Sequence, residues 1–428
     1  MTSGQRVTAE ADRPRETVRT VTLCQGCDSA ELRTVIDFGH QPPVHALLRR
    51  GQLDLPEVSY PLRLIRCVSC GLVQLSHVVD PRIVFPKEYP YLTSMTPVMR
   101  ANFRQLAAEA KQRLGLGPGD LAVDIGSNDG TLLEGFQELG LRVLGVEPTD
   151  IAKIAVERGI PTLQRFFDRQ LAQEIAAQYG RARIVTATNV IAHVDDIVDV
   201  LAAIRMLLTD DGVFVSESHY LLDLIEGLQY DTIYHEHLRY YSLRPFAALA
   251  QRAGLHVVDA SRIRTHGGSI RVWAALRTDG ARASELAALM RSEDEHGLYV
   301  EETYRHFRHR VVDQKQRLLE LLLRLRREGV RVAGVGAPAR AGTLINTCHL
   351  DPDVLEFIRE QDGSLKVGLY MPLSHIPVVD ERHFLAEQPE YAIILSWHIA
   401  EEVIASVRAK GYRGRFIMPL PDPVILKD

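Results

Sequence analysis

The chain has 428 residues, of which 46% are hydrophobic and 25% are charged, and its formal net charge is −5. This composition is typical of a water-soluble protein with two or three domains, and it lacks the basic excess of nucleic-acid-binding proteins. No apolar run is long enough to cross a membrane, and the arginine-rich first twenty residues lack the apolar core of a signal peptide. We therefore expect a cytoplasmic protein with a disordered N-terminal tail and with neither a membrane nor a nucleic acid as partner.

Four of the five cysteines form two C-x-x-C pairs, Cys24 with Cys27 and Cys67 with Cys70. Two such tight turns can supply four thiolates to one tetrahedral Zn²⁺. A redox pair would need only one of them, and structural disulfides are rare in a reducing compartment. The pattern therefore predicts a structural zinc site. We assign residues 1–80 to a small zinc-binding domain that follows the tail and has extended segments at 32–38 and 61–67.

A passage rich in proline and tyrosine follows at 81–100, and an amphipathic helix is predicted over 99–114. Tyr89 and Tyr91 lie in this passage, between the zinc-binding domain and a cofactor motif. Their pattern is compatible with two interpretations, tyrosines that pack within a loop or a lid that closes an active site.

The succession of strand, glycine turn, helix and strand begins at residue 121. Asp124 lies in the first apolar run, the turn contains Gly126 and Gly130, and the second apolar run ends at Glu147. In doubly wound sheets the glycines let a ligand approach the backbone, and the downstream acid binds ribose hydroxyls. Carboxylates around the turn would repel a pyrophosphate but suit the sulfonium and ammonium groups of S-adenosylmethionine. The segment favours a methyltransferase cofactor site over a dinucleotide site or an ordinary turn.

Alternating strands and helices predict a Rossmann-like α/β domain over 81–282. Asn189 and His193 follow one of its strands, at the edge where such sheets bind ligands. The run Tyr234-His-Glu-His237 lacks the spacing of an H-E-x-x-H zinc site. It offers instead a histidine base, an orienting carboxylate and a phenol that can polarise an oxyanion. The alternative is a solvated helix start with aromatic anchors.

A second, smaller α/β domain is predicted over 283–428. A long charged helical region at 283–328 leads into a strand at 330–335, the turn Gly336-Ala-Pro-Ala-Arg340 and a helix at 343–348. Further strands are expected at 354–358, 391–395 and 415–418. Backbone amides of the glycine turn could hold a phosphate group, with Arg340 nearby.

Taken together, these motifs resemble the nucleotide-sugar C-methyltransferase family, which methylates dTDP-linked 4-keto-deoxysugars on the way to antibiotic sugars. The likeness covers nearly the whole chain, in the family's order. It rests on the zinc knuckles and on the segments Ile125-Gly-Ser-Asn-Asp-Gly130, Val146-Glu-Pro148, Asn189-Val-Ile-Ala-His193, Tyr234-His-Glu-His237, His266-Gly-Gly-Ser269, and Gly336-Ala-Pro-Ala339 with Asn346. The architecture it implies is an N-terminal zinc domain, a central domain that binds S-adenosylmethionine, and a C-terminal domain that holds the nucleotide of a small-molecule substrate.

The resemblance also implies roles for individual residues. His237 would remove a proton from the carbon beside a ketone, with Tyr234, Glu236 and His193 around the reacting sugar and Tyr89 closing the site. The residues expected to bind the cofactor are Asp124, Gly126, Asn128, Gly130, Glu147 and Asn189. Those expected to bind the substrate are Tyr91, His266, Arg340 and Lys366.

The chain departs from the family pattern at Arg340-Ala-Gly342, Gly363-Ser364, His398 and Pro42-Pro-Val-His45. These changes leave methyl transfer intact and keep the acceptor open: an unusual sugar, a different nucleotide, or a keto compound without a nucleotide. We expect methylation at C3, with C5 as the alternative, by a monomer or a homodimer. A dinucleotide-dependent enzyme and a zinc-containing interaction protein are the competing classes, and the acids of the first turn and the Tyr234–His237 run argue against them.

Overall fold

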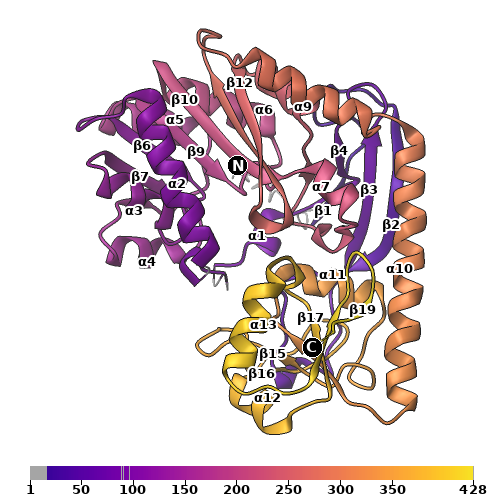
Figure 1. The fold of residues 1–428 in the computed structure, drawn as a ribbon. Coiled ribbons are helices and arrows are strands. Elements are labelled where there is room, and N and C mark those ends of the chain that lie inside the picture. The colour runs from indigo at the N-terminus through magenta and orange to yellow at the C-terminus, as the bar shows by residue number, and fades with distance from the viewer. Residues whose placement is uncertain (1–16, 88, 90, 96, 428) are drawn as a thin grey trace, which may run out of the picture.

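The computed structural model describes residues 17–87, 89, 91–95 and 97–427, and the predicted disordered tail lies, up to residue 16, outside them. The described chain forms a central lobe, a zinc lobe that contains the four paired cysteines, and a C-terminal lobe (Figure 1). Among the described residues, no helix combines the length and the apolar character that spanning a bilayer requires.

The central lobe is built on a sheet with the strand order β12-β13-β10-β9-β6-β7-β8. β13 runs antiparallel to both of its neighbours, and the other pairs are parallel. The bounds are Leu121–Ile125 for β6, Arg142–Val146 for β7, Thr162–Leu163 for β8, Ala182–Thr188 for β9, Leu208–His219 for β10, His256–Ile263 for β12 and Ser269–Ala275 for β13. This is the predicted Rossmann-like α/β sheet.

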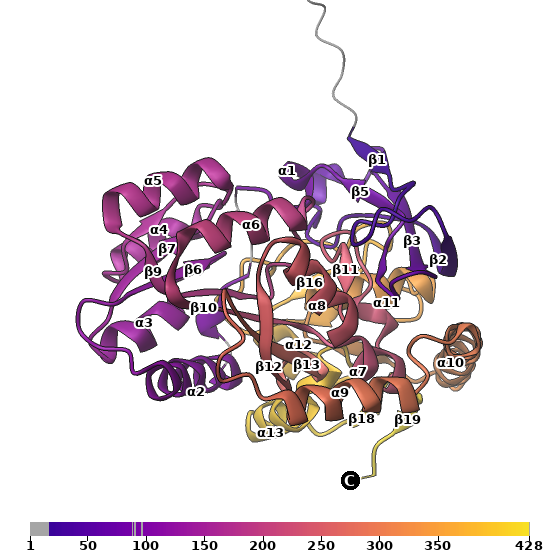
Figure 2. The same ribbon diagram turned by 90° about the horizontal axis from the view of Figure 1, so that it is seen from above.

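Helices cover both faces of this sheet (Figure 2). On one face lie α2 (Pro97–Leu114) and α3 (Thr131–Glu138), and on the other lie α5 (Arg169–Tyr179) and α6 (Ile197–Leu207). Each helix buries apolar side chains at helical spacing, which gives it one face for the core. In α3, for example, Leu132, Leu133 and Phe136 are buried. The remaining helices of this lobe are α4 (Ile151–Glu157), α7 (Leu221–Glu226) and α8 (Leu243–Arg252).

The zinc lobe shares a strand with the central domain. Its sheet has the order β11-β4-β3-β2, with β2 at Leu32–Gln41, β3 at Tyr60–Cys67, β4 at Val73–Leu75 and β11 at Arg239–Tyr240. β11 pairs with β4 in antiparallel register, and the amide of Leu75 donates to the carbonyl of Leu238 at 2.9 Å. The chain just after the Tyr234–His237 run is therefore anchored on the zinc lobe. A separate pair joins β1 (Val18–Thr20) to β5 (His77–Val79), and α1 spans Pro81–Val84.

The C-terminal lobe has the strand order β16-β15-β14-β17-β18-β19, with β19 antiparallel. The expected strands appear as β14 (Val332–Val335), β17 (Tyr391–Ile394) and β18 (Arg415–Met418). The strand expected at 354–358 is wrong: β15 is Ile358–Arg359, and the apolar Leu355 and Phe357 before it are buried in the core from a turn. The other elements are α11 (Ala339–Thr347), β16 (Val378–Val379), α12 (Glu381–Glu387), α13 (Ala400–Ala409) and β19 (Val424–Ile425).

The helical region expected at 283–328 is two helices, α9 (Ala283–Glu295) and α10 (Glu301–Arg327). The break contains Gly297, whose φ of +68° is a left-handed conformation that glycine adopts without strain. α10 runs along one side of the molecule from the zinc lobe to the C-terminal lobe (Figure 1), and its residue Glu301 pairs with Arg66 of β3 at 2.8 Å.

Candidate active site

One cavity of about 600 Å³ lies where the three lobes meet. Apart from Gly130, every residue that the sequence predicted for catalysis, cofactor binding or substrate binding lines it. These lining residues are Tyr89, Tyr91, Asp124, Gly126, Asn128, Glu147, Asn189, His193, Tyr234, Glu236, His237, His266, Arg340 and Lys366. A cavity of this size is typical of small-molecule sites.

The glycine turn brings the backbone to one end of the cavity. Gly126 has a φ of +67°, and a Cβ added to it would lie 2.4 Å from Cγ2 of Val190, so no larger residue fits. Gly130 has a φ of +78° at the start of α3, and its added Cβ would meet Ile160 at 3.0 Å. Gly130 therefore shapes the turn without reaching the cavity.

Polar groups at this end match S-adenosylmethionine. The Glu147 carboxylate accepts hydrogen bonds from the amides of Asn128 (3.1 Å) and Thr149 (2.9 Å), which fix it at the end of β7. Burial raises the pKa of Asp124 to about 7, and the hydroxyl of Thr186 donates to it at 2.6 Å. Asn189 Oδ1 is a buried acceptor without a partner among the described residues. A ligand with a ribose diol and an ammonium group supplies the donors that these oxygens lack.

Replacing Glu147 tests this end of the cavity. We expect Glu147→Gln to weaken S-adenosylmethionine binding by about 10- to 100-fold, because a hydrogen bond to a charged acceptor contributes roughly 1.5–3 kcal/mol. Isothermal titration measures the loss, and Glu138→Gln, on an exposed position of α3, is the control that should bind normally. An unchanged affinity would remove Glu147 from the cofactor site.

The tyrosine passage is tied to the glycine turn by side-chain hydrogen bonds. Asn128 Oδ1 accepts from the amide of Thr93 at 2.9 Å, and its Nδ2 donates to the carbonyl of Tyr91 at 3.1 Å. Both polar atoms of Asn128 are thus used by the protein, although its side chain borders the cavity. The same passage carries Tyr89, whose hydroxyl donates to Glu236 Oε2 at 3.0 Å.

His237 is a buried imidazole with a fixed tautomer. Its Nδ1 lies 2.8 Å from the carbonyl oxygen of Thr232, and because a carbonyl can only accept, Nδ1 carries the ring proton and Nε2 has a free lone pair. Burial lowers the pKa of His237 well below its ordinary value, and His193 contributes to the same shift. The imidazole is therefore ready to accept a proton at neutral pH.

Groups that can donate hydrogen bonds surround His237. The ring centroid of Tyr234 lies 4.1 Å from that of His237, and the ring of His193 lies 4.9 Å from it. Burial raises the pKa of Tyr234 well above its ordinary value, so its hydroxyl stays protonated. Burial also lowers the pKa of His193 to about 4, so this ring stays neutral. An oxyanion that forms beside His237 would find neutral donors here.

Glu236 is a buried carboxyl group. Burial raises its pKa to about 8, so at neutral pH it is mostly protonated. Tyr89 donates to its Oε2, and Nε2 of His45 lies 3.5 Å from its Oε1. The alternative interpretation of this run, a solvated helix start, is wrong, because His235, Glu236 and His237 are buried and Tyr234 is partly buried. The run follows a short 3-10 turn at Tyr230–Thr232.

His235 faces the zinc lobe instead, with Nε2 3.2 Å from the carbonyl oxygen of Tyr60. Burial lowers the pKa of His235 to about 4, whereas in the unfolded chain it is near 6.5. Between these two pH values the unfolded chain therefore binds more protons than the folded one. The free energy of unfolding should therefore rise with pH between about 4 and 6.5, and more steeply in the wild type than in His235→Gln, by at most about 1.4 kcal/mol per pH unit. Urea titrations across this window measure both slopes. Equal slopes would contradict the prediction.

The C-terminal lobe closes the other end of the cavity with buried cations. Arg340 donates from Nη2 to the carbonyl of His266 at 3.0 Å, its guanidinium lies over Trp397, and its Nε is 3.8 Å from Asp231. Its Nη1 is buried without a partner among the described residues. Lys366 donates to the carbonyl of Ala337 at 2.6 Å and is also buried. This end of the cavity can hold an anionic group.

Three histidines of the cavity were missed as functional candidates: His45, His219 and His398. His219 is the last residue of β10, and its ring lies 4.8 Å from that of His237. The apolar run at 212–216 predicts a strand that ends three residues before His219, so the sequence does not place His219 at the ligand-binding edge. His45 and His398 were noted only as departures from a family pattern, because no periodicity places their loops in space.

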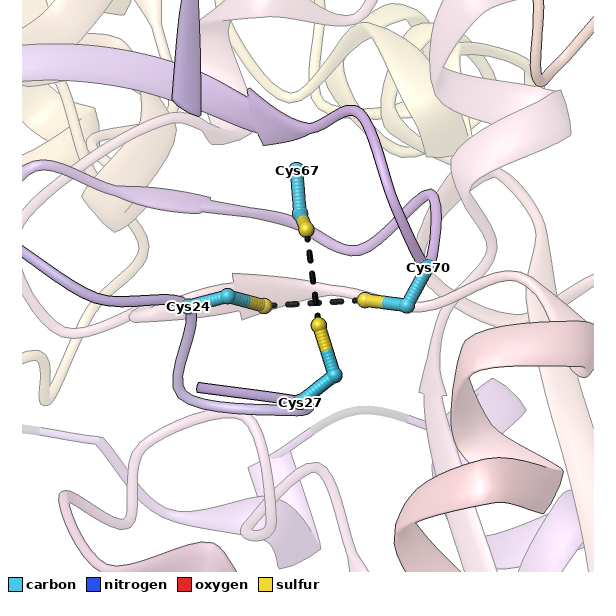
Figure 3. Close-up of side chains that lie close together, drawn as sticks. All are labelled: Cys24, Cys27, Cys67 and Cys70. Carbon is cyan, nitrogen blue, oxygen red and sulfur yellow. Dashed lines mark hydrogen bonds between the residues drawn. The ribbon is translucent and has the colours of Figure 1, made fainter. Parts of the chain in front are cut away.

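The four paired cysteines converge on one point (Figure 3). All four Sγ atoms lie within 4.8 Å of one another, with 3.5 Å between Cys24 and Cys70 and 3.6 Å between Cys27 and Cys67. These separations are close to the edge of about 3.8 Å in a tetrahedron with Zn–S bonds of about 2.3 Å, and too long for disulfides. The donor set fits Zn²⁺ as predicted. None of the four cysteines lines the cavity, which makes a structural role the natural one.

Comparisons with known proteins agree with this geometry. The family described as "Methyltransferase domain" matches residues 99–260, a zinc binding domain matches 24–85, and "C-methyltransferase C-terminal domain" matches 264–421. The C-methyltransferase NovU of Streptomyces niveus is 34% identical over 415 residues, which cover 96% of this chain and 98% of that protein.

Two further similarities each cover less than half of this chain. A ubiquinone biosynthesis O-methyltransferase of Methylobacterium sp. (strain 4-46) is 28% identical over 206 residues, which cover 44% of this chain and 81% of that protein. The crystal structure of magnesium protoporphyrin IX methyltransferase from Synechocystis PCC 6803 is 15% identical, covers 42% of this chain and 87% of that one, and superposes with a TM-score of 0.34.

The fold is that of an S-adenosylmethionine-dependent methyltransferase with a Rossmann-like core, a zinc-binding domain and a C-terminal α/β domain. The chain belongs to the C-methyltransferase family and is an S-adenosylmethionine-dependent C-methyltransferase.

Proposed function

We propose that the enzyme methylates the carbon next to the ketone of a nucleotide-linked keto-sugar, in the first instance C3 of a dTDP-linked 4-keto-deoxysugar in natural-product biosynthesis. The observation that carries this proposal is a buried, neutral His237 in the lining of the cavity, with its lone pair free and with donors beside it. We keep the division into domains 1–80, 81–282 and 283–428 as part of the proposal.

The residue types fit proton removal beside a ketone. Nε2 of His237 takes the proton from the carbon, and the electron pair of that C–H bond moves onto the carbonyl oxygen to give an enolate. The hydroxyl of Tyr234 and an N–H of His193 stabilise the charge on this oxygen, a contribution of about 3 kcal/mol for one such donor. S-adenosylmethionine, when bound, supplies an electrophilic methyl group. Glu236 and Tyr89 line the same part of the cavity as His237, and in this proposal they exclude water from the reacting carbon.

The buried cations support a carrier with negative charge. Arg340 and Lys366 lie in the C-terminal lobe, and a guanidinium that is buried with an unpartnered Nη1 favours an anionic ligand such as a diphosphate. His266, whose carbonyl accepts a hydrogen bond from Arg340, and Tyr91 line the same cavity and would contact the sugar. A C5 acceptor, another nucleotide and a keto compound without a nucleotide are the alternatives to this assignment.

Replacing Arg340 distinguishes these carriers. We expect Arg340→Gln to raise the KM for a dTDP-linked 4-keto-6-deoxysugar by about 10- to 100-fold, because a charge-assisted hydrogen bond to phosphate is lost. The affinity for S-adenosylmethionine should stay the same. Steady-state kinetics with mass detection of the methylated product measures the change, with Arg413→Gln, an exposed position of the same lobe, as the control. An unchanged KM, or turnover of free keto compounds alone, would contradict a nucleotide-linked carrier.

A further inference from the structure

His45 is a buried titratable side chain that the mechanism above does not use. It lies in the loop that follows β2, and through this loop the zinc lobe contributes a side chain to the lining of the cavity. Its side chain is only 5% exposed, and Nδ1 has no hydrogen-bond partner among the described residues. A buried polar atom without a hydrogen bond destabilises the folded state, so the position of this imidazole calls for an explanation.

The neighbours of His45 belong to the catalytic cluster. Nε2 lies 3.5 Å from Oε1 of Glu236, and the ring meets the ring of Tyr89 edge-on, with 4.8 Å between the centroids. Tyr89 donates to Oε2 of the same carboxyl at 3.0 Å. Oε1 has no hydrogen-bond partner in the described part of the chain, and Nε2 of His45 is the group that faces it. The carboxyl of Glu236 thus has Tyr89 on one oxygen and His45 on the other.

The protonation states of the pair are complementary. Burial raises the pKa of Glu236 and lowers that of His45, and the charge of Lys366 acts on both groups. The pair is therefore a neutral carboxylic acid beside a neutral imidazole. Because the hydroxyl of Tyr89 donates to Oε2, the acid proton belongs on Oε1, where the lone pair of Nε2 can accept it. At 3.5 Å the two atoms are farther apart than in a full hydrogen bond, and catalytic hydrogen bonds are often this long in the absence of substrate.

The C-terminal lobe holds the loop of His45 through residues before and after it in the sequence. Val44 packs against Gly342 of α11, where an added Cβ would lie 3.4 Å from Cγ1 of Val44. Leu48 and Tyr370 of the C-terminal lobe exchange two backbone hydrogen bonds of 2.9 Å. The backbone cannot carry His45 away from Glu236 without breaking these contacts, so the contact is part of the folded state.

We propose that His45 is a positioning residue of the active site, which fixes the Glu236 carboxyl through Oε1 while Tyr89 holds Oε2. The zinc lobe then supplies a functional group to the reaction centre and does more than stabilise the fold. Held in this way, the carboxyl of Glu236 keeps one face toward the reacting carbon. This step of the inference rests on the proposed function.

The contact itself is tested without any substrate. Infrared spectra of the full-length, zinc-loaded enzyme are recorded at neutral pH, and the difference between the wild type and Glu236→Gln isolates the carboxyl bands of Glu236. We expect His45→Ala to shift these bands and His45→Gln, whose side-chain amide oxygen can accept the acid proton in place of Nε2, to restore them partly. His40→Ala, an exposed position on β2, should leave them in place. Bands that stay unshifted in His45→Ala would overturn the proposal.

The consequence for catalysis is tested by a double-mutant cycle with a dTDP-linked 4-keto-6-deoxysugar. We expect His45→Ala to lower kcat about tenfold in the wild type, the effect of one lost hydrogen bond, and less than about twofold in the Glu236→Gln background. Effects that multiply in the double variant would mean that His45 does not act through Glu236. A wild-type enzyme that leaves this sugar unmethylated would refute the proposed substrate, whereas the infrared result would still decide the role of His45.

Discussion

The variant His237→Ala should lose methyl transfer by about 10³-fold in kcat, the contribution expected of a positioned general base. The cause is the loss of the only lone pair that the tautomer fixed by the Thr232 carbonyl leaves free on this ring. Product formation is measured by mass in single-turnover experiments, so that slow product release does not hide the effect.

Two controls separate chemistry from folding in this experiment. S-adenosylmethionine affinity by isothermal titration should change less than about twofold, because the glycine turn and Glu147 lie on other elements. His40→Ala, which removes an exposed imidazole, should retain full turnover. Turnover of His237→Ala within tenfold of the wild type would assign the base to another residue, with His219 as the nearest second imidazole.

Loss of the zinc ion should have the second large effect. Cys27→Ser removes one of four converging thiolates, and we expect it to bind less than one equivalent of zinc and to lower the free energy of unfolding by about 3–5 kcal/mol. Activity should fall as well, because Cys67 ends β3, Cys70 precedes β4, and β4 holds the strand that follows His237.

Metal analysis, urea titration and turnover measure these consequences together. Cys348→Ser is the matched control, because Cys348 is buried near the hydroxyl of Tyr230 and outside the cluster. It should keep its zinc. A Cys27→Ser protein with a full equivalent of zinc and an unchanged midpoint would contradict the assignment of four thiolates.

The parts of the fold that could be predicted are those encoded within a few residues. The strand, glycine turn and helix around Gly126 were predicted because a local period of apolar residues and two glycines define them. Strand ends were less predictable: β10 extends to His219 because it pairs with β9 and β13 over its length. Such pairing depends on partners far along the chain.

The part of the site that was not predicted also depends on contacts between residues far apart in the sequence. Asp124, Glu147 and His237 belong to recognisable motifs, whereas His45 enters the cavity through a loop whose position is set by Gly342 and Tyr370, some 300 residues away. The pairing of β11 with β4 is equally non-local. No pattern near residue 45 carries this information, and only the assembled lobes reveal it.

Solvent exchange at the acceptor carbon tests the central claim most directly. A dTDP-linked 4-keto-6-deoxysugar is incubated in D₂O with the enzyme and S-adenosylhomocysteine, so that proton removal occurs without methylation, and the sugar is observed by NMR. The account predicts deuterium incorporation at the carbon beside the ketone by the wild type and none above background by His237→Ala. Incorporation that persists in His237→Ala, or its absence in a wild-type enzyme that methylates the same sugar, would contradict it.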